Sequence, residues 1–362
     1  MNKEISSGYK SIKILHVLNN FDIVNGITTT CSVIFKEIDK SNEFELSLAL
    51  GNKSESDISK LNIKNIFIDK SFDYTKRNIL NFIKAFYFSF KLIRNNNFDI
   101  IHTHHFYHSF IFSCLKIFGK FKVVRTIHGL IPNKGVLPHY YADEFISVSR
   151  GNLELLKILK PKLISKIILI HNSHDLKLGK SKNHFVKMKF LVASRLTHEK
   201  GIHILLKAIS ILPKINRNFT ISIAGNGELE EEVKIFCVKN KIIFLGTVKD
   251  IPKIINHYDC LISPIIGDEE KEGFPSIIAK SAMSKLAVIS SDFTGYNYYL
   301  NNKNSFIYNK YNPDELAKTI LKVANNRNIA IRKSEIIFKD FKLDFDKKEN
   351  FDKLKQLYFS LL

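Results

Sequence analysis

The sequence predicts an α/β protein with two doubly wound domains. Short apolar runs typical of buried parallel strands alternate with longer helical patterns, and this order occurs in both halves of the chain. The 362 residues, 45% of them hydrophobic, suffice for about two domains of ordinary size. Residues 176–187 are rich in Lys, Ser, Asn and Gly and lack an apolar period, as expected of a linker. We therefore expect one domain over residues 1–178 and a second over residues 188–340.

The first half begins with a strand, a loop and a helix. Residues 11–17 (SIKILHV) alternate and then turn apolar, which favours a strand, and the pattern of residues 27–38 favours a helix. Gly26 lies just before that helix. Glycine at a helix N-terminus lets backbone amides approach a ligand, but an ordinary turn contains glycine as well.

Further strands of the first half are expected over residues 44–49, 66–69, 98–103, 122–127 and 167–170, and residues 142–149 should form a strand that leads into a helix capped by Ser149. The helix expected over residues 76–94 combines large apolar side chains with five basic ones. Such a helix can lie on an anionic membrane surface, or it can pack against the core with its basic side in solvent. A second aromatic and basic segment, residues 106–122, supports the membrane alternative.

Histidines gather around the strand at residues 98–103: His102, His104, His105 and His108. Their density suggests a metal site, but acidic co-ligands are sparse nearby, so we expect no metal. His128 follows the strand at residues 122–127 and should lie at the carboxyl end of the sheet, where an imidazole can hydrogen-bond a ligand hydroxyl. A histidine that merely ends the strand would give the same pattern.

The second half repeats the order of strand, loop and helix. Strands are expected over residues 188–193, 219–224, 242–245, 260–263 and 287–291, helices over residues 202–212 and 312–325, and a helical tail over residues 341–362. Arg195 and Lys200 lie between the first of these strands and its helix, where two cations can bind a diphosphate and neutralise it as it leaves. Gly225 and Gly227 form a Gly-x-Gly after the next strand, which alone is a weak phosphate signal.

Residues 260–292 are the most informative stretch. A short strand runs into an acidic loop, and Glu272-Gly273-Phe274-Pro275-Ser276 then opens a helix that should end near Ser284. The next strand follows directly. This unit of strand, helix and parallel strand would place a carboxylate where ligands bind in open α/β sheets.

Several of these stretches resemble the retaining GT-B glycosyltransferases of family 4. Glu272, Gly273 and Phe274 fall on that family's motif Glu-Gly-Phe-x-x-x-x-x-Glu-Ala, which a small-residue turn and Pro-Val-Ile follow. Residues 194–201 (SRLTHEKG) resemble its Gly-Arg-Leu-x-x-Glu-Lys-Gly. Three positions depart from the pattern, because Lys280 replaces the second Glu, Lys285 the turn Gly and Ala287 the Pro.

The resemblance implies two Rossmann-like domains facing a cleft, with the donor nucleotide on the second, the acceptor on the first, and the tail returning to the first. It implies retaining transfer from a nucleotide sugar, without a cofactor or metal. Arg195 and Lys200 would stabilise the departing diphosphate. Glu272 would hold the donor sugar, and His128 would hydrogen-bond it. Gly26 would contact the acceptor or the diphosphate. The donor would be contacted by further residues of the second domain: Gly225, Gly227, Gly246, Gly273, Phe274, Pro275 and Lys280.

Lys280 leaves an alternative open. The family's Glu accepts hydrogen bonds from two ribose hydroxyls, whereas an ammonium has only donors. Lys280 therefore either meets a phosphate or impairs the site, and in the second case the chain is a non-catalytic homologue that acts as partner subunit or scaffold. Lys285 adds a cost of about 1 kcal/mol if it must adopt the left-handed conformation that glycine takes freely.

Composition narrows the partners and the compartment. The net charge of +20 attracts polyanions, but no nucleic-acid recognition motif accompanies it, so we expect no nucleic-acid partner. The start lacks the apolar core of a signal peptide, and no apolar stretch reaches the roughly 18 residues of a membrane span. We therefore expect a cytoplasmic protein, peripheral at the inner face of the membrane if the basic helix binds lipid. A glycan or lipid-linked acceptor in bacterial surface polysaccharide synthesis, of capsule or lipopolysaccharide, fits this setting by resemblance.

Overall fold

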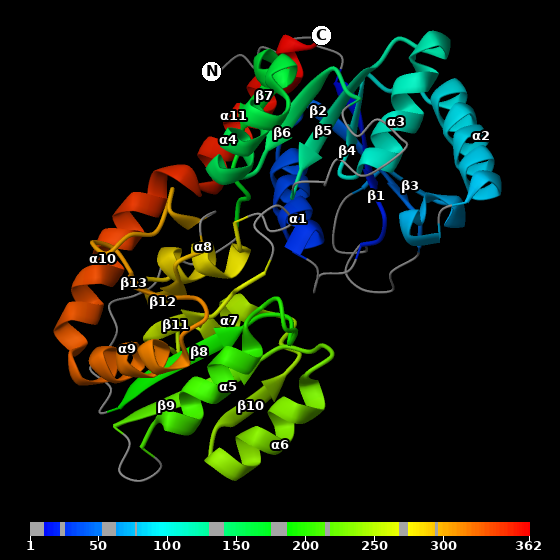
Figure 1. The fold of residues 1–362 in the computed structure, drawn as a ribbon. Coiled ribbons are helices and arrows are strands. Elements are labelled where there is room, and N and C mark those ends of the chain that lie inside the picture. Colours follow the sequence, from blue (N-terminus) through cyan, green and yellow to red (C-terminus); the bar gives the residue numbers. More distant parts are fainter. Residues whose placement is uncertain are drawn as a thin grey trace, which may run out of the picture. The chain divides into compact units, whose positions relative to one another are not determined.

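The chain divides into two compact units, drawn as ribbons in Figure 1. Unit 1 comprises Met1–Val148, Leu156–Ser173 and Asn350–Leu362, and unit 2 comprises Ser149–Leu155 and His174–Glu349. This computed structural model describes residues 11–21, 26–52, 63–76, 78–129, 141–174, 187–213, 218–267, 274–293 and 296–362. Residues 175–186, which hold most of the predicted linker, lie outside the described residues.

Unit 1 is built on a parallel sheet whose described strands run in the order β3-β2-β1-β4-β5-β6-β7. The strands are Ile12–Leu18 (β1), Phe44–Leu50 (β2), Asn65–Ile68 (β3), Ile100–Thr103 (β4), Lys122–Ile127 (β5), Glu144–Ser147 (β6) and Ile167–Leu169 (β7). The strand order reverses between the neighbours β1 and β4. Ligands of open α/β sheets bind outside the carboxyl ends of the strands at such a switch point.

Helices cover both faces of this sheet, as parallel sheets require. They are Gly26–Asp39 (α1), Ile79–Asn95 (α2), Phe106–Cys114 (α3) and Lys347–Ser360 (α11), together with the 3-10 turn Leu115–Phe118 (η4). A further helix, Arg150–Leu159 (α4), is divided between the units, since its residues up to Leu155 belong to unit 2. Side chains of a strand point alternately to its two faces. Accordingly, Ile14 and Leu18 of β1 pack with α1 and α11, while Leu15 and Val17 pack with α2 and α3.

Unit 2 repeats this plan with described strands in the order β10-β9-β8-β11-β12-β13. The strands are Met188–Ala193 (β8), Phe219–Ala224 (β9), Ile243–Gly246 (β10), Cys260–Ser263 (β11), Ala287–Ser291 (β12) and Phe306–Tyr308 (β13). The helices are Ile202–Ile211 (α5), Glu230–Asn240 (α6), Ile251–Ile255 (α7), Ser276–Met283 (α8), Pro313–Asn325 (α9) and Arg327–Asp344 (α10). One apolar core lies between the sheet and α5, α6 and α9, and another involves α8 and α10.

The predicted fold class is confirmed, and most predicted elements agree with the structure to within three residues. The predicted cap of α4 is also present, because the Asn152 N–H donates to Ser149 Oγ at 3.2 Å. The sequence patterns did not reveal α3, α6, α7, β13 or most of α10. None of the helices in the described ranges is both long enough and apolar enough to cross a membrane.

The tail over residues 341–362 is helical, as predicted, but it is not one continuous helix. Within it, α10 ends at Asp344 and α11 begins at Lys347. Asp346 Oδ1 accepts hydrogen bonds from the N–H groups of Lys348 at 2.9 Å and Glu349 at 3.0 Å. The Asp346 carboxylate therefore caps a new helix, because it satisfies two amides of the first turn that have no partner within the helix.

Candidate functional site

The loop between β8 and α5 carries Arg195 and Lys200. It leaves β8 at the carboxyl edge of the sheet of unit 2, where β8 and β11 are neighbours at the switch point. The N–H of Leu196 donates to a carbonyl of the loop after β9 at 2.7 Å. On the other side, the N–H of Ile266 donates to the Glu199 carbonyl oxygen at 3.1 Å. Both cations predicted for the diphosphate thus lie on one loop that is braced on two sides.

Gly225 and Gly227 make this bracing possible. Both have positive φ, 144° and 151°. A Cβ on Gly225 would lie 1.9 Å from the Ser194 carbonyl oxygen, and one on Gly227 would lie 2.6 Å from the Leu196 carbonyl oxygen. Only glycine fits this approach of two backbones. The Gly-x-Gly that was predicted to contact the donor therefore has a structural task as well, since it holds the Arg195 loop in place.

Two further glycines differ in what surrounds them. Gly201, before α5, has φ 68°, and a Cβ there would lie 1.8 Å from the Pro264 carbonyl oxygen. Gly201 therefore lets the cationic loop lie against the loop after β11. Gly246, which is predicted to contact the donor, has φ 60° and open space where a Cβ would be. Its carbonyl oxygen accepts a hydrogen bond from the Gly225 N–H at 2.8 Å.

Glu272 and Gly273 lie outside the described residues, but the structure describes both ends of their loop. The loop starts beside the cations, since a Cβ on Gly267 would lie 3.1 Å from the Glu199 carbonyl oxygen. It ends at Phe274, whose buried ring packs against Tyr299 with centroids 4.4 Å apart. Pro275 then precedes the first turn of α8. The Phe274 side chain is thus an anchor in the core, and any contact of Phe274 with a donor would come from its backbone.

Lys280, on α8, is 9% exposed. Burial lowers the pKa of its ammonium, and the charge of Asp250 opposes this shift. His174 lies close enough for Lys280 to lower the pKa of its imidazole, although burial is the larger cause. Among the described residues, neither ring nitrogen of His174 has a hydrogen-bond partner. The structure therefore places a buried cation and an unsatisfied imidazole close together, at the position where the sequence resemblance implies a ribose-binding Glu. His174 was not among the residues predicted from the sequence.

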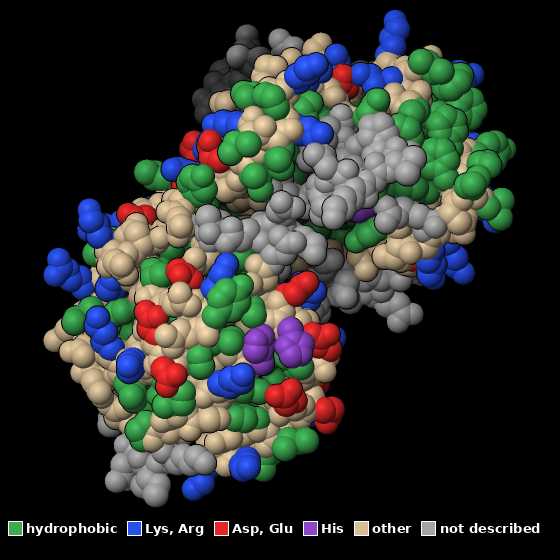
Figure 2. All heavy atoms as spheres, viewed as in Figure 1, with side chains coloured by type: hydrophobic (Ala, Val, Ile, Leu, Met, Phe, Trp, Pro, Cys, Tyr) green, Lys and Arg blue, Asp and Glu red, His purple; other side chains and the backbone are tan. Residues whose placement is uncertain are grey.

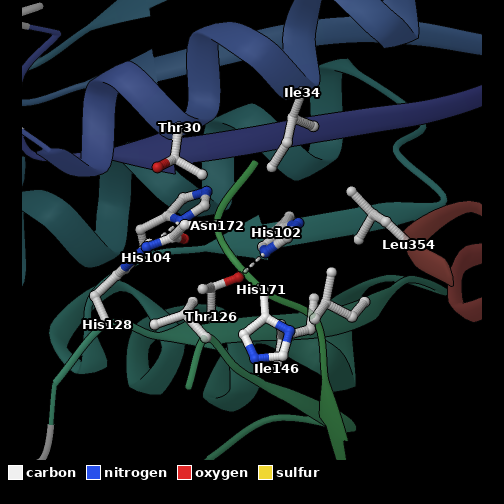
Figure 3. A pocket seen from close by; sticks show the side chains of 12 residues that line it. Thr30, Ile34, His102, His104, Thr126, His128, Ile146, His171, Asn172 and Leu354 are labelled. Atoms are coloured by element: carbon white, nitrogen blue, oxygen red, sulfur yellow. Dashed lines mark hydrogen bonds between the residues drawn. The ribbon is translucent and has the colours of Figure 1, made fainter. Parts of the chain in front are cut away.

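His128 ends β5 at the carboxyl edge of the sheet of unit 1, as predicted. It lines a small cavity together with residues of α1, β4 and the segment after β7 (Figure 3). The cavity measures about 20 Å³, enough for a single water molecule. Burial, with a smaller contribution from the nearby charge of Arg125, lowers the pKa of His128 to about 4, so the ring is neutral at pH 7. Its Nδ1 is buried without a hydrogen-bond partner among the described residues.

The four histidines of residues 102–108 do not converge. His105 accepts a hydrogen bond from the Tyr107 N–H and stacks on Tyr74, with ring centroids 3.7 Å apart. His108 Nε2 lies 2.8 Å from the Phe72 carbonyl oxygen.

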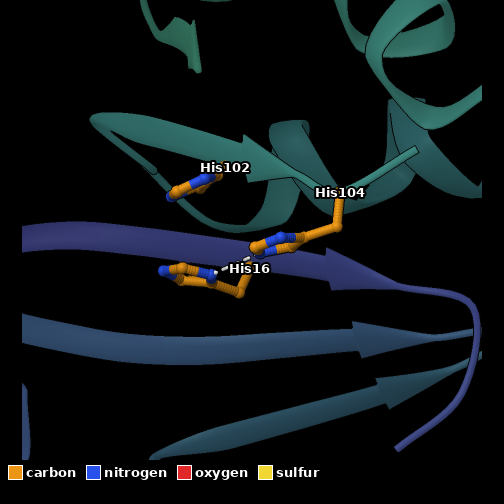
Figure 4. Close-up of side chains that lie close together, drawn as sticks. All are labelled: His16, His102 and His104. Carbon is orange, nitrogen blue, oxygen red and sulfur yellow. Dashed lines mark hydrogen bonds between the residues drawn. The ribbon is translucent and has the colours of Figure 1, made fainter. Parts of the chain in front are cut away.

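His102 and His104 instead meet His16 of β1 (Figure 4). Nitrogen atoms of these three rings lie within 4.8 Å of one another. His16 was not among the residues predicted from the sequence, although a histidine in a buried apolar strand is an unusual residue.

Gly26 begins α1 and is exposed, with open space where a Cβ would be. Among the described residues, nothing around Gly26 requires glycine, so its predicted role at the acceptor or diphosphate rests on position alone.

Two family models match the chain. The model of the group 1 glycosyl transferases matches residues 187–326, and that of glycosyltransferase family 4 matches residues 48–178. The capsular polysaccharide biosynthesis glycosyltransferase CapH of Staphylococcus aureus is 22% identical over 96% of this chain and 99% of its own. The UDP-Gal:alpha-D-GlcNAc-diphosphoundecaprenol alpha-1,3-galactosyltransferase of Escherichia coli is 23% identical over 75% of this chain and 78% of its own.

Solved structures share the fold. A glycosyltransferase from Rickettsia africae matches with a TM-score of 0.78 and 18% identity, over 98% of this chain and 99% of its own. Anabaena Alr3699/HepE, solved in complex with UDP-glucose, matches with a TM-score of 0.76 and 15% identity, over 96% of this chain and 100% of its own.

Proposed function

The chain belongs to the group 1 glycosyltransferases of GT-B fold, and from this premise we propose that it transfers a sugar from a nucleotide-sugar donor with retention of the anomeric configuration. The observation that carries the proposal is the braced loop with Arg195 and Lys200 at the switch point of unit 2. Two cations carried on a loop whose backbone is held before the reaction can stabilise a diphosphate as it gains charge, with little reorganisation of that backbone during the step. This arrangement supplies the electrostatic role that a divalent metal has in other transferases, so no metal is required.

Glu272 and His128 take the remaining roles in this proposal. Glu272 holds donor hydroxyls and, as a carboxylate, stabilises positive charge that develops on the sugar ring. His128 is neutral and its Nδ1 is unpaired, so it can form one hydrogen bond with the donor sugar. Lys280 and His174 cannot reproduce the carboxylate contacts to ribose. We propose instead that the Lys280 ammonium binds a phosphate oxygen of the donor.

A lipid-linked glycan at the membrane is the acceptor that unit 1 fits best. The Escherichia coli relative acts, by its name, on a diphosphoundecaprenol-linked sugar. In this chain, apolar side chains gather over α2 (Figure 2). Ile79 is 81% exposed and Ile83 is 57% exposed, and the exposed Ile117 and Phe118 of η4 lie beside α2 through a contact of Phe90 with Phe118. Exposed basic residues accompany them: Lys84, Lys91, Arg94 and Lys120.

Exposed apolar groups edged by basic ones bind anionic lipid surfaces. We therefore place the enzyme at the cytoplasmic face of the membrane, in the synthesis of a bacterial surface polysaccharide. CapH, by its name, has a role of this kind.

A thermal-shift screen tests donor binding. UDP, GDP, CMP, ADP and their common sugars are added to the full chain, because a ligand that binds only the folded state raises the unfolding temperature. We expect one nucleotide family to stabilise the protein. Arg195→Ala should weaken its binding about tenfold or more, since a charge-assisted hydrogen bond contributes about 1.5–3 kcal/mol. The matched control is Lys239→Ala, which removes an exposed cation of α6 and should leave binding unchanged.

Lys280→Met tests the proposed contact of Lys280 with a phosphate. The substitution removes a buried cation that has no ion pair among the described residues, so the free protein should become more stable. If Lys280 binds a phosphate, the same variant loses affinity for the nucleotide. Absence of stabilisation by every nucleotide in the wild-type protein would favour the non-catalytic subunit or scaffold instead.

A further inference from the structure

A continuous chain of hydrogen bonds crosses the interior of unit 1 and ends at His128. We propose that this chain fixes which nitrogen of His128 carries the proton, and so decides whether its free Nδ1 meets the ligand as donor or as acceptor; the link to the ligand rests on the proposed function. The histidine chain, as we call it, consists of Thr126, His102, Tyr358, His16, His104 and His128.

The inner half of the histidine chain joins β5 to the C-terminal helix. His102 Nε2 lies 2.7 Å from Thr126 Oγ1, and His102 Nδ1 lies 2.5 Å from the Tyr358 hydroxyl. Tyr358, on α11, is fully buried, and burial raises the pKa of its hydroxyl well above the usual value, so it keeps its proton. A hydroxyl both donates and accepts, so Tyr358 can pass the direction of the bonds from one ring to the next.

The outer half runs from Tyr358 to the cavity. The Tyr358 hydroxyl lies 3.3 Å from His16 Nε2, and His16 Nδ1 lies 3.1 Å from His104 Nε2. His104 Nδ1 lies 3.0 Å from His128 Nε2. Figure 4 shows the contact between His16 and His104. Cys31 Sγ also lies 3.6 Å from His104 Nε2, but a thiol is a weak donor and does not replace His16 as the partner.

All four imidazoles are neutral at pH 7. Burial is the largest cause of the lowered pKa of each ring: His16, His102, His104 and His128. A neutral imidazole has one N–H donor and one acceptor nitrogen. Each ring therefore accepts on one side and donates on the other. The Tyr358 oxygen could accept from both of its neighbouring rings, but its own buried O–H would then have no acceptor in the histidine chain, so only two orders satisfy every group.

The two orders give a rule that can be measured. In the first, every bond points toward His128, and all four rings carry their proton on Nδ1. In the second, every bond points toward Thr126, and all four carry it on Nε2. His128 then presents an Nδ1–H to a phosphate or hydroxyl oxygen in the first order, and a lone pair to a sugar hydroxyl in the second. A mixture of the two tautomers within the histidine chain would leave two donors or two acceptors facing each other or, if the change falls at Tyr358, leave its buried O–H without an acceptor in the histidine chain.

A metal ion is the competing explanation of the cluster of His16, His102 and His104. Histidine ligands of metals usually donate their second N–H to a carboxylate, a carbonyl or water. Here both nitrogens of each of the three rings lie in the hydrogen bonds of the chain, and its members include no carboxylate. Metal binding would break several of these bonds, so the geometry favours the hydrogen-bonded chain.

The test is ¹⁵N NMR of the full chain labelled at histidine, without any substrate, so its result does not depend on donor binding. Each ring signal is assigned to its residue by correlation with the backbone signals of the same histidine. The ¹⁵N chemical shifts of the ring then report which nitrogen is protonated. We expect His16, His102, His104 and His128 to share one tautomer at pH 7. A mixed set in the wild-type protein overturns the proposal. Displacement of the signals of His16, His102 and His104 by one equivalent of zinc would also overturn it, in favour of a metal site.

Tyr358→Phe makes the test sharper. Without the hydroxyl, His16 avoids a buried unpaired N–H by protonating Nδ1, and His102 does so by protonating Nε2, because orphaned donors are rare in proteins. Whichever order the wild type has, His102 must then differ from His128. The control is Tyr308→Phe, which removes a buried hydroxyl without a partner in the described part of unit 2 and should leave the shared tautomer intact.

Unchanged tautomers in Tyr358→Phe contradict the proposal. Should this variant fail to fold, Thr126→Val is the second perturbation. It removes the partner of His102 Nε2 and should leave all four rings protonated on Nδ1, and any ring protonated on Nε2 in that variant contradicts the proposal.

Discussion

Lys285 and Ala287 are two residues at which the chain departs from the family pattern. Lys285 has φ 56°, so it adopts the left-handed conformation that the sequence pattern suggested. Its ammonium lies 3.0 Å from a carboxylate oxygen of Glu335 and 4.9 Å from the centre of the Phe338 ring. These contacts offset the backbone strain. Ala287 donates its N–H to the Asp259 carbonyl oxygen at 3.0 Å, a hydrogen bond that proline could not form.

Substitutions at Lys285 should invert the usual order of alanine and glycine. Lys285→Ala keeps the strained backbone and loses both side-chain contacts, so the unfolding free energy should fall by about 1 kcal/mol. Lys285→Gly loses the contacts but relieves about 1 kcal/mol of strain, so it should be close to the wild type. Unfolding midpoints in urea measure the difference.

Lys241 is the matched control, since it has φ 55° at the end of α6 and an exposed side chain. Lys241→Gly relieves the strain without losing contacts and should exceed the wild type by about 1 kcal/mol. Greater stability of alanine than of glycine at position 285 would show that strain does not govern this turn.

At the scale of elements, the loops at the carboxyl edge of unit 2 depend on glycines that let backbones touch. Gly225 and Gly246 both have positive φ. Of these two glycines, only Gly225 has a neighbouring atom, the Ser194 carbonyl oxygen, where a Cβ would lie.

Gly225→Ala should therefore lower the unfolding free energy by about 3 kcal/mol or more, because both strain and a backbone clash act on it. Gly246→Ala carries the strain alone and should cost about 1 kcal/mol. Thermal unfolding measures both changes. Donor affinity should fall in Gly225→Ala, because the Arg195 loop must shift to accommodate the methyl group. Equal effects of the two variants would contradict the structural role of Gly225.

The helix α2 carries the prediction about the membrane. Replacing Ile79 and Ile83 by Ser should strongly reduce sedimentation of the protein with vesicles that contain anionic lipid at low salt. The substitutions remove apolar side chains that insert into the lipid and leave only the attraction of the neighbouring cations. Replacement of the exposed Ile235 and Val238 of α6 by Ser is the matched control and should have no effect. Sedimentation that is equal for both double variants would place the lipid contact elsewhere.

At the scale of the whole molecule, buried histidines in both units predict that stability falls with decreasing pH. Burial lowers the pKa of His16, His102, His104, His108, His128 and His174. For His108 and His128 the folded-state pKa is about 4. The unfolded chain takes up protons below about pH 6.5 and the folded chain does not, so each such group lowers the unfolding free energy by up to about 1.4 kcal/mol per pH unit.

Urea midpoints between pH 8 and pH 4.5 measure this dependence. The midpoint should be nearly constant above pH 7 and fall steeply from about pH 6.5 to pH 4.5. Glu43 and Asp73 have lowered pKa values, so their contribution is lost only at lower pH. A midpoint that stays constant down to pH 5 would mean that the buried histidines are protonated in the folded protein.

The sequence determined the order of elements and the fold class, because strand and helix patterns depend on neighbours a few residues apart. It also placed Arg195, Lys200 and His128 just after strands, and strand ends share one edge of a parallel sheet. The break between α10 and α11 at Asp346 was not predicted from the sequence. A carboxylate caps a helix only when the local backbone brings the amides of the first turn to it, as the amides of Lys348 and Glu349 are brought here.

Only the tertiary structure decided which distant residues meet. Tyr358 and His16 are 342 positions apart in sequence and join one histidine chain. The tertiary structure also buries Lys280 beside His174 and brings the Ser194 carbonyl oxygen against Gly225. Spacing along a sequence records what neighbours do to one another, whereas hydrogen bonding and burial depend on which elements pack together, and that is fixed only when the sheets and helices assemble.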